Sequence, residues 1–158
     1  MKQYIQPFIS VCENVFLEFL GEKLEVKLPY FVGKDEVYDW DVSAIIGLIG
    51  EARGAVVLSM RDELALKLTN ILAAGRMDNI DQGDVMDTVG EIVNIIAGNV
   101  KYELEESFKL VISLPTLIKG KEHSISWPDG QTNVICIPFT IFNKENFSLF
   151  IALEAVKS

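Results

Sequence analysis

Residues 81–106 read DQGDVMDTVGEIVNIIAGNVKYELEE, and this stretch decides the fold because its polar and apolar residues separate onto opposite sides of one long helix. The side expected to face the core carries Val85, Val89, Ile92, Ile96 and Val100, with Met86, Val93, Ala97 and Leu104 on its flank. Asp81 or Asp84 can cap the first turn, and an acidic start suits the positive end of the helix dipole. We therefore expect a long amphipathic helix packed on the rest of the domain.

The outward side of this helix carries Asp84, Asp87, Glu91, Asn94 and Gly98. Glu91 and Asn94 lie three residues apart, so the carboxylate and the carboxamide can reach the same bound object. A glycine inside a helix costs roughly 1 kcal/mol relative to alanine, and one physical use for Gly98 is to let a partner approach the backbone closely. Spacing alone does not define a site, because exposed Glu and Asn side chains on helices are usually only solvated.

The segments around the long helix predict two further helices and several strands. A helix is expected over about 6–20, where Pro7 suits a first helical position and Phe16, Phe19 and Leu20 lie on the buried face. A second helix over 61–74 has Ser59 as its cap, Gly75 at its end, and Leu64, Leu68, Ile71 and Leu72 on its buried face. Strand patterns cover 22–29, 36–47, 54–60, 109–118, 123–127, 132–139 and 146–156.

Turn residues indicate how some of these strands connect. Gly50 and Glu51 predict a hairpin turn between two strands, which explains the local glycines better than a phosphate-binding loop. Residues 128–130 read PDG and predict a turn that pairs 123–127 with 132–139. The fold class that follows is α/β of the α+β type, a largely antiparallel sheet packed with a few helices that include the long central one.

Composition limits the classes of function. At 158 residues, of which 49% are hydrophobic, the chain is long enough for one domain over residues 1–158 and short for two. A net charge of −9 without a clustered basic patch disfavours nucleic acid and anionic membranes as partners. The sequence lacks a secretory signal and an apolar run of about 18 to 20 residues, so we expect a cytoplasmic protein without a membrane segment.

Cysteine and histidine offer little for metal or nucleophilic chemistry. Cys12 and Cys136 lie in apolar contexts without a C-x-x-C spacing, so we expect reduced core thiols rather than a disulfide or a catalytic pair. His123 is the single histidine, which leaves little material for a metal site or a histidine-based triad. We therefore expect no metal site in this chain.

Residues 90–101, GEIVNIIAGNVK, resemble the CheX branch of the CheC/CheX/FliY family of bacterial chemotaxis phosphatases. The family's E-x-x-N is present as Glu91 and Asn94, and the branch's G-N pair and lysine follow as Gly98, Asn99 and Lys101. Further similar segments are IQPFIS at 5–10, the S-x-P of Ser113, Leu114 and Pro115 with Gly120 after it, and Ile137, Pro138 and Phe139. The resemblance thus extends over nearly the whole chain.

The amino-terminal helix indicates which branch of the family the chain resembles. In the CheC branch this helix has an E-x-x-N of its own. Here Glu13 is followed three residues later by Phe16, and Glu18 by Gly21, so neither position pairs a carboxylate with a carboxamide. The single pair on the long helix is therefore typical of CheX.

The resemblance implies a CheC/CheX-like fold and a phosphatase that hydrolyses the phosphoaspartate of a CheY-type response regulator, in chemotaxis or related two-component signalling. It implies that Asn94 orients the attacking water and that Glu91 pairs with a lysine of the regulator. Mg²⁺ would be carried by the regulator, so the chain needs no cofactor of its own. From their helix positions, Asp87, Ile95 and Gly98 are expected to contact the partner. The resemblance also implies a homodimer joined at sheet edges, for which residues 147–156 could supply an edge.

Two other hypotheses stay open at this point. The chain could be a non-catalytic binding module of the same fold that sequesters or scaffolds a signalling partner. It could also be a ligand-sensing or structural α/β domain, in which Glu91 and Asn94 are ordinary surface residues. A substitution of Asn94 distinguishes the three, because it should abolish phosphatase activity, spare partner binding, or change nothing, respectively.

Overall fold

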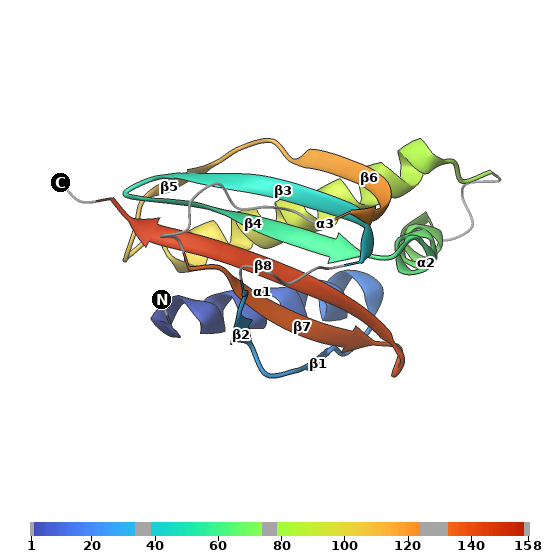
Figure 1. Cartoon of the computed structure of the whole chain (residues 1–158), viewed down its shortest axis with the longest axis horizontal. Coiled ribbons are helices and arrows are strands. Elements are labelled where there is room, and N and C mark those ends of the chain that lie inside the picture. The colour runs from blue at the N-terminus through green and yellow to red at the C-terminus, as the bar shows by residue number, and fades with distance from the viewer. Residues whose placement is uncertain (1, 34–38, 74–78, 124–132, 157–158) are drawn as a thin grey trace.

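A computed structural model describes residues 2–33, 39–73, 79–123 and 133–156. Within them the chain forms three helices and an eight-stranded sheet (Figure 1). The helices are α1 (Lys2–Leu20), α2 (Asp62–Ala73) and α3 (Gln82–Glu103). The strands are β1 (Glu25–Val26), β2 (Tyr30–Phe31), β3 (Trp40–Gly50), β4 (Ala52–Met60), β5 (Leu110–Ile112), β6 (Thr116–His123), β7 (Ile135–Ile141) and β8 (Glu145–Ala155).

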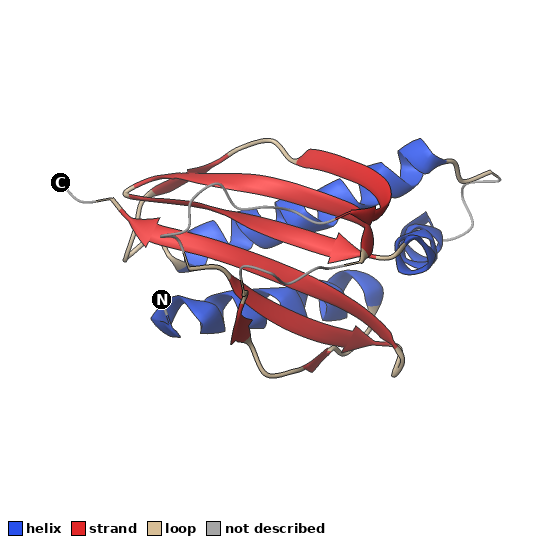
Figure 2. Ribbon diagram, viewed as in Figure 1, coloured by secondary structure: helices blue, strands red, loops and turns tan. Residues whose placement is uncertain are grey.

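The strands run in the order β1-β7-β8-β4-β3-β5, with β2 also paired to β7 and β6 also paired to β3. Every one of these pairings is antiparallel. Figure 2 shows α1 and α3 lying behind the sheet, with α2 at one end of it. This architecture confirms the predicted α+β class and places the long helix across the buried face of the sheet.

The core lies between the helices and this face of the sheet. The predicted stripe of α3 is buried in it, from Val85 to Val100. Helix α1 is fixed by aromatic stacking, with the ring centroids of Phe16 and Phe147 4.9 Å apart and those of Phe139 and Phe147 5.1 Å apart. Stacked pairs of this kind stabilise by about 0.5–1.5 kcal/mol beyond their buried area.

The start of α3 is capped as its sequence predicts. Asp81 is the N-cap, and its carboxylate accepts a hydrogen bond from the backbone N–H of Asp84 at 2.9 Å. The Asp84 carboxylate in turn accepts one from the backbone N–H of Asp81, also at 2.9 Å. This reciprocal capping box satisfies two backbone donors and fixes where the helix begins.

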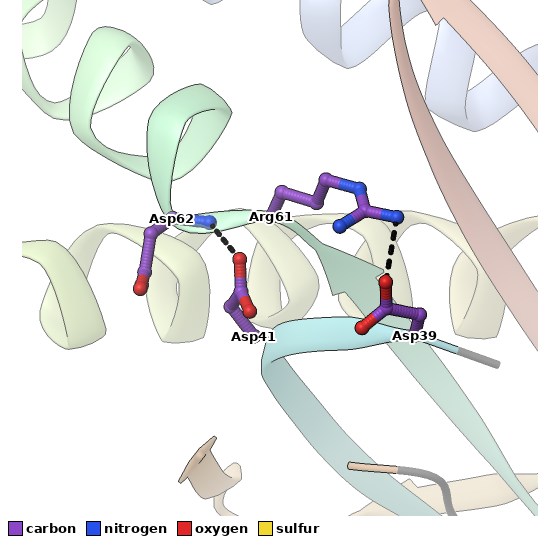
Figure 3. Close-up of polar contacts among 4 residues, drawn as sticks. All are labelled: Asp39, Asp41, Arg61 and Asp62. Carbon is purple, nitrogen blue, oxygen red and sulfur yellow. Dashed lines mark hydrogen bonds and ion pairs between the residues drawn. The ribbon is translucent and has the colours of Figure 1, made fainter. Parts of the chain in front are cut away.

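Helix α2 is capped by a residue distant in sequence, and the prediction of Ser59 as its cap is wrong. Asp41, on β3, accepts a hydrogen bond from the backbone N–H of Asp62 at 2.9 Å (Figure 3). Ser59 is buried inside β4, where its hydroxyl lies 2.6 Å from that of Ser43. Because β4 continues to Met60, the helix begins too late for Ser59 to reach its first turn. Ala74 and Gly75, at the predicted end of this helix, lie outside the described residues.

The predicted hairpin at Gly50 and Glu51 is confirmed, because it joins β3 to β4 and Gly50 has a positive φ of 147°. The predicted pairing of 123–127 with 132–139 is contradicted at the described residues. His123 pairs with Trp40 on β3, and β7 is paired with β8 on one side and with β1 and β2 on the other. Residues 124–132, including the turn at 128–130, lie outside the described residues.

The prediction that residues 147–156 form a sheet edge is also wrong. Strand β8 is hydrogen-bonded to β7 on one side and to β4 on the other. It joins β7 through a tight turn in which Phe142 and Asn143 have positive φ values of 56° and 62°. Its middle residues are buried on both faces, which is typical of a central strand.

Candidate functional site

Helix α3 presents Glu91 and Asn94 on the side that faces away from the sheet. Glu91 and Asp87 are exposed, and Asn94, Ile95 and Gly98 are half-buried. These positions are fixed because the opposite stripe of the helix is locked in the core. The structure therefore places all five predicted site residues along one side of a single rigid element.

The two side chains of the pair are available to a partner. Within the described part of the chain, neither the Glu91 nor the Asn94 side chain has a hydrogen bond or an ion pair. The Asn94 amide can donate and accept at the same time, which suits it to hold a water molecule. Asp87 and Glu91 are four residues apart, and like charges at this spacing repel. A cation held between these two carboxylates would relieve that repulsion.

Gly98 leaves the helix backbone open on this side. A Cβ built on Gly98 would meet no atom of the described residues within 4 Å, apart from its own turn of the helix, so packing within the described structure does not require a glycine there. The next residue, Asn99, turns back on its own helix, where its amide donates to the Ile95 carbonyl at 2.9 Å. The open backbone at Gly98 is therefore the feature of the G-N pair that faces outward.

Gly90, just before Glu91, lies where α3 packs against Pro115 and against Leu117 on β6, and the residue pattern alone did not identify it. A Cβ there would lie 3.1 Å from a methyl group of Leu117 on β6 and 3.7 Å from Pro115. A side chain at this position would require Leu117 to move by a few tenths of an ångström, so the glycine allows the helix to pack this closely on the strand. The pattern of exposed polar residues missed it because Gly90 is buried.

Pro115 belongs to the S-x-P motif, whose structural role is now evident. The Ser113 hydroxyl accepts a hydrogen bond from the Gly47 N–H at 2.8 Å and donates one to the Leu114 carbonyl at 3.0 Å. The Ser113 N–H donates to the Gly47 carbonyl at 3.0 Å. The motif thus satisfies the backbone N–H and carbonyl of Gly47 on β3, at the point where the partner of β3 changes from β5 to β6. It also positions Pro115 against Gly90.

Helix α1 carries no second pair. Phe16 occupies the place where a carboxamide would follow Glu13, and its ring is fully buried against Phe147. The expectation that the acid and amide occur together only on the long helix is consistent with this geometry.

A pocket next to Glu91 was not anticipated from the sequence. Its volume is about 280 Å³, and it lies between the three helices. It is lined by Val15, Phe16, Phe19 and Leu20 of α1, Leu72 of α2, and Glu91, Ile92 and Ile95 of α3. The sequence signal was present, because Phe19, Leu20 and Leu72 continue the apolar faces of their helices. The helical pattern predicted that they are buried, and for Phe19 and Leu72 this is wrong, because they surround an open pocket and are 51% and 38% exposed.

The remaining reactive groups have structural roles. His123 donates from Nδ1 to the Gly120 carbonyl at 2.8 Å, which leaves Nε2, 2.7 Å from the Ser43 hydroxyl, to accept a hydrogen bond. Cys12 and Cys136 are buried and not joined in a disulfide, and burial raises the pKa of the Cys12 thiol. No group of three His, Cys, Asp or Glu residues that could hold a metal occurs in the described ranges. Among the helices that the structure describes, none is long and apolar enough to span a membrane.

An antiparallel sheet backed by a long helix, with an acid and an amide one turn apart on its outer side, forms an α+β domain with the arrangement that the resemblance to the CheC/CheX family implies. Comparison with known proteins supports this assignment. The sequence model of the family described as Chemotaxis phosphatase CheX matches residues 42–140. The chain belongs to this family.

Individual relatives are similar over nearly the whole chain. The CheY-P phosphatase CheX of Thermotoga maritima is 27% identical over 147 residues, which cover 92% of each chain. The crystal structure of CheX from Desulfovibrio desulfuricans has a TM-score of 0.85 at 27% identity, and the match covers 96% of this chain and 99% of that one. The CheX–CheY–BeF₃–Mg²⁺ complex from Borrelia burgdorferi has a TM-score of 0.77 at 27% identity, with 96% and 97% covered.

Proposed function

We propose that this chain acts as a single domain over residues 1–158 that accelerates hydrolysis of the phosphoaspartate on a CheY-type response regulator. The observation that carries the proposal is the pair of Glu91 and Asn94, one turn apart and without partners among the described residues, on the outward side of α3. Family membership supports it, as does the Thermotoga maritima relative named as a CheY-P phosphatase. The Borrelia burgdorferi CheX structure includes CheY, BeF₃ and Mg²⁺, and BeF₃ stands in for the phosphoryl group.

The reaction requires little covalent chemistry from this chain. Hydrolysis joins a water oxygen to phosphorus, breaks the bond from phosphorus to the aspartyl oxygen, and releases phosphate. Asn94 holds the water in line with phosphorus, because its amide can donate and accept hydrogen bonds without keeping a proton. Glu91 binds the ammonium group of a regulator lysine and so orients the partner. The regulator's Mg²⁺ neutralises charge on the transferring phosphoryl group.

The rest of the outward side contacts the regulator. Asp87 adds a second carboxylate one turn before Glu91, which favours a cation between them. The open backbone at Gly98 allows the partner to lie close to α3, and Ile95 adds apolar contact. The chain carries a net charge of −9, so long-range attraction to an acidic receiver domain is weak and short-range contacts determine docking.

Two finer features belong to the same proposal. We place the protein in the cytoplasm, where CheY-type regulators act. We also propose a homodimer joined at an outer strand of the sheet, at the β1 end or the β5 end of the strand order, because β8 is paired on both sides. Sedimentation of the purified chain measures this oligomeric state directly.

The decisive experiment follows phosphate loss from a phosphorylated CheY-type regulator with Mg²⁺, with wild-type protein, Asn94→Ala and Asn99→Ala. Asn99 is a matched control, because it is an asparagine on the same helix whose amide is bonded to the Ile95 carbonyl. Losing the group that positions the water should reduce the rate by about 100-fold or more. The Asn99 variant should keep most of its activity.

Binding separates the enzyme from a non-catalytic module. Asn94→Ala should still bind the regulator loaded with BeF₃ and Mg²⁺, and its circular dichroism should match that of the wild type. A wild-type protein that binds this regulator without accelerating phosphate loss would instead establish the binding module. Equal rates for the wild type and Asn94→Ala would remove Asn94 from the chemistry.

A further inference from the structure

The pocket beside Glu91 has the shape and lining of a receptor for an apolar side chain. Val15, Phe16 and Ile92 are each at most 5% exposed and form its floor. Phe19 and Leu72, which line it at the surface, are 51% and 38% exposed. A cavity of roughly 150 Å³ admits a benzene ring. The pocket's volume of about 280 Å³ therefore accommodates an aromatic or a branched aliphatic side chain.

Apolar residues around the pocket are left in water by this chain. Phe19 and Leu72 are exposed at the opening of the pocket, whereas Leu17 and Ile71, which are similarly exposed on the same helices, do not line it. Exposed apolar side chains that line a pocket beside a polar functional residue are typical of an interaction site.

The position of the pocket identifies its occupant. Glu91 is a residue of both the pocket wall and the proposed reactive pair, and Ile95 lines the pocket next to Asn94. A protein that brings a phosphoaspartate to Asn94 and a lysine to Glu91 must lay its own surface across α3 beside this opening. Because the chain is strongly acidic, docking to an acidic partner requires apolar burial rather than charge attraction.

We infer that the pocket between α1, α2 and α3 receives one apolar side chain from the response regulator's surface beside its phosphorylation site. This inference rests on the proposed function and adds a docking element to it. The pocket supplies affinity and selects regulators that carry such a side chain, whereas Asn94 supplies the chemistry. Most binding energy in protein interfaces comes from a few buried apolar anchors of this kind.

The test compares two pairs of alanine variants matched in exposure and helix. Phe19→Ala and Leu72→Ala remove walls of the pocket. Leu17→Ala and Ile71→Ala remove side chains of similar exposure on the same helices that do not line it. Each variant is titrated against a CheY-type regulator loaded with BeF₃ and Mg²⁺, and its kcat and KM for dephosphorylation are measured.

Each lining variant should raise Kd and KM by about tenfold, as expected for an interface anchor, while kcat stays within about twofold. The control variants should bind nearly as the wild type does. Lining variants that bind as tightly as the controls would overturn the inference, even if the wild-type protein is an active phosphatase. A change in the sedimentation of the lining variants alone, without regulator, would also overturn it, because the pocket would then be covered by a second copy.

The proposed function fails separately. A wild-type protein that neither binds nor dephosphorylates any CheY-type receiver from the same cell would overturn the phosphatase proposal and the docking pocket together. An active wild type whose Asn94→Ala variant is inactive but binds normally leaves the four alanine variants to decide the role of the pocket alone.

Discussion

Replacing Gly98 with alanine should stabilise the protein and weaken its activity at once. Gly98 lies inside α3, five residues before its last residue, and a Cβ there would meet no atom of the other described elements within 4 Å. An alanine in a helix interior is more favourable than a glycine by roughly 1 kcal/mol. For a domain of this size, that difference corresponds to a rise in Tm of roughly 2–4 °C.

Activity should change in the opposite direction, because the added methyl group occupies the space through which the regulator reaches the helix backbone. Displacement of reacting groups by about 1 Å can cost 100-fold, so a loss of tenfold or more in kcat/KM is expected. Thermal unfolding followed by circular dichroism measures the first effect, and phosphate release from the regulator measures the second.

Gly90→Ala is the matched comparison for the stability measurement. It adds the same methyl group to the same helix, but its Cβ would lie 3.1 Å from Leu117, so its Tm should lie below that of Gly98→Ala. A lower Tm for Gly98→Ala would refute the expected gain, because the position would then not be open. A variant that is more stable and fully active would refute the expected loss, because no partner would then approach Gly98.

Two further predictions concern the support of the helix and the buried thiols. Gly90→Val should lower the free energy of unfolding by about 1–3 kcal/mol, because a branched side chain overpacks the contact with β6. A variant that melts like the wild type would contradict this. The same substitution should reduce phosphatase activity, because it shifts Glu91. Cys12 and Cys136 should resist a thiol reagent at pH 8 in the native protein and both react after unfolding. Because burial raises the pKa of the Cys12 thiol, the native state keeps a proton that the unfolded chain releases above about pH 9. The urea midpoint should therefore fall as pH rises through that value, and an unchanged midpoint would show that this thiol contributes nothing.

Local patterns predicted α3 almost completely. Its capping box, its buried stripe and its outward row follow from residues within four positions of one another, and the structure confirms the first two directly. The placement of Glu91 and Asn94 on one side of the helix follows from the same spacing. Helical periodicity is a property of neighbouring residues, so sequence alone is sufficient for it.

Contacts between residues far apart in the sequence could not be predicted from local patterns. The cap of α2 comes from Asp41, which is 21 residues away, whereas the residues adjacent to the helix indicated Ser59 instead. The turn pattern at 128–130 suggested a hairpin, yet β6 lies on β3 and β7 on β8. The partner of a strand depends on how well it packs with every other strand of the sheet, so the sequence of one segment does not determine it.

The sequence by itself determined the class of fold, the long helix and the acid–amide pair, because each depends on composition or on spacing along one element. Only the tertiary structure decided that β8 is central, that Gly90 fits against Leu117, and that Phe19, Leu72 and Glu91 surround one pocket. The three helices that line the pocket contribute residues far apart in the chain, and the place where these residues meet depends on how each helix packs against the sheet. The pair for the chemistry is therefore encoded locally, whereas the pocket beside it exists only in the folded molecule.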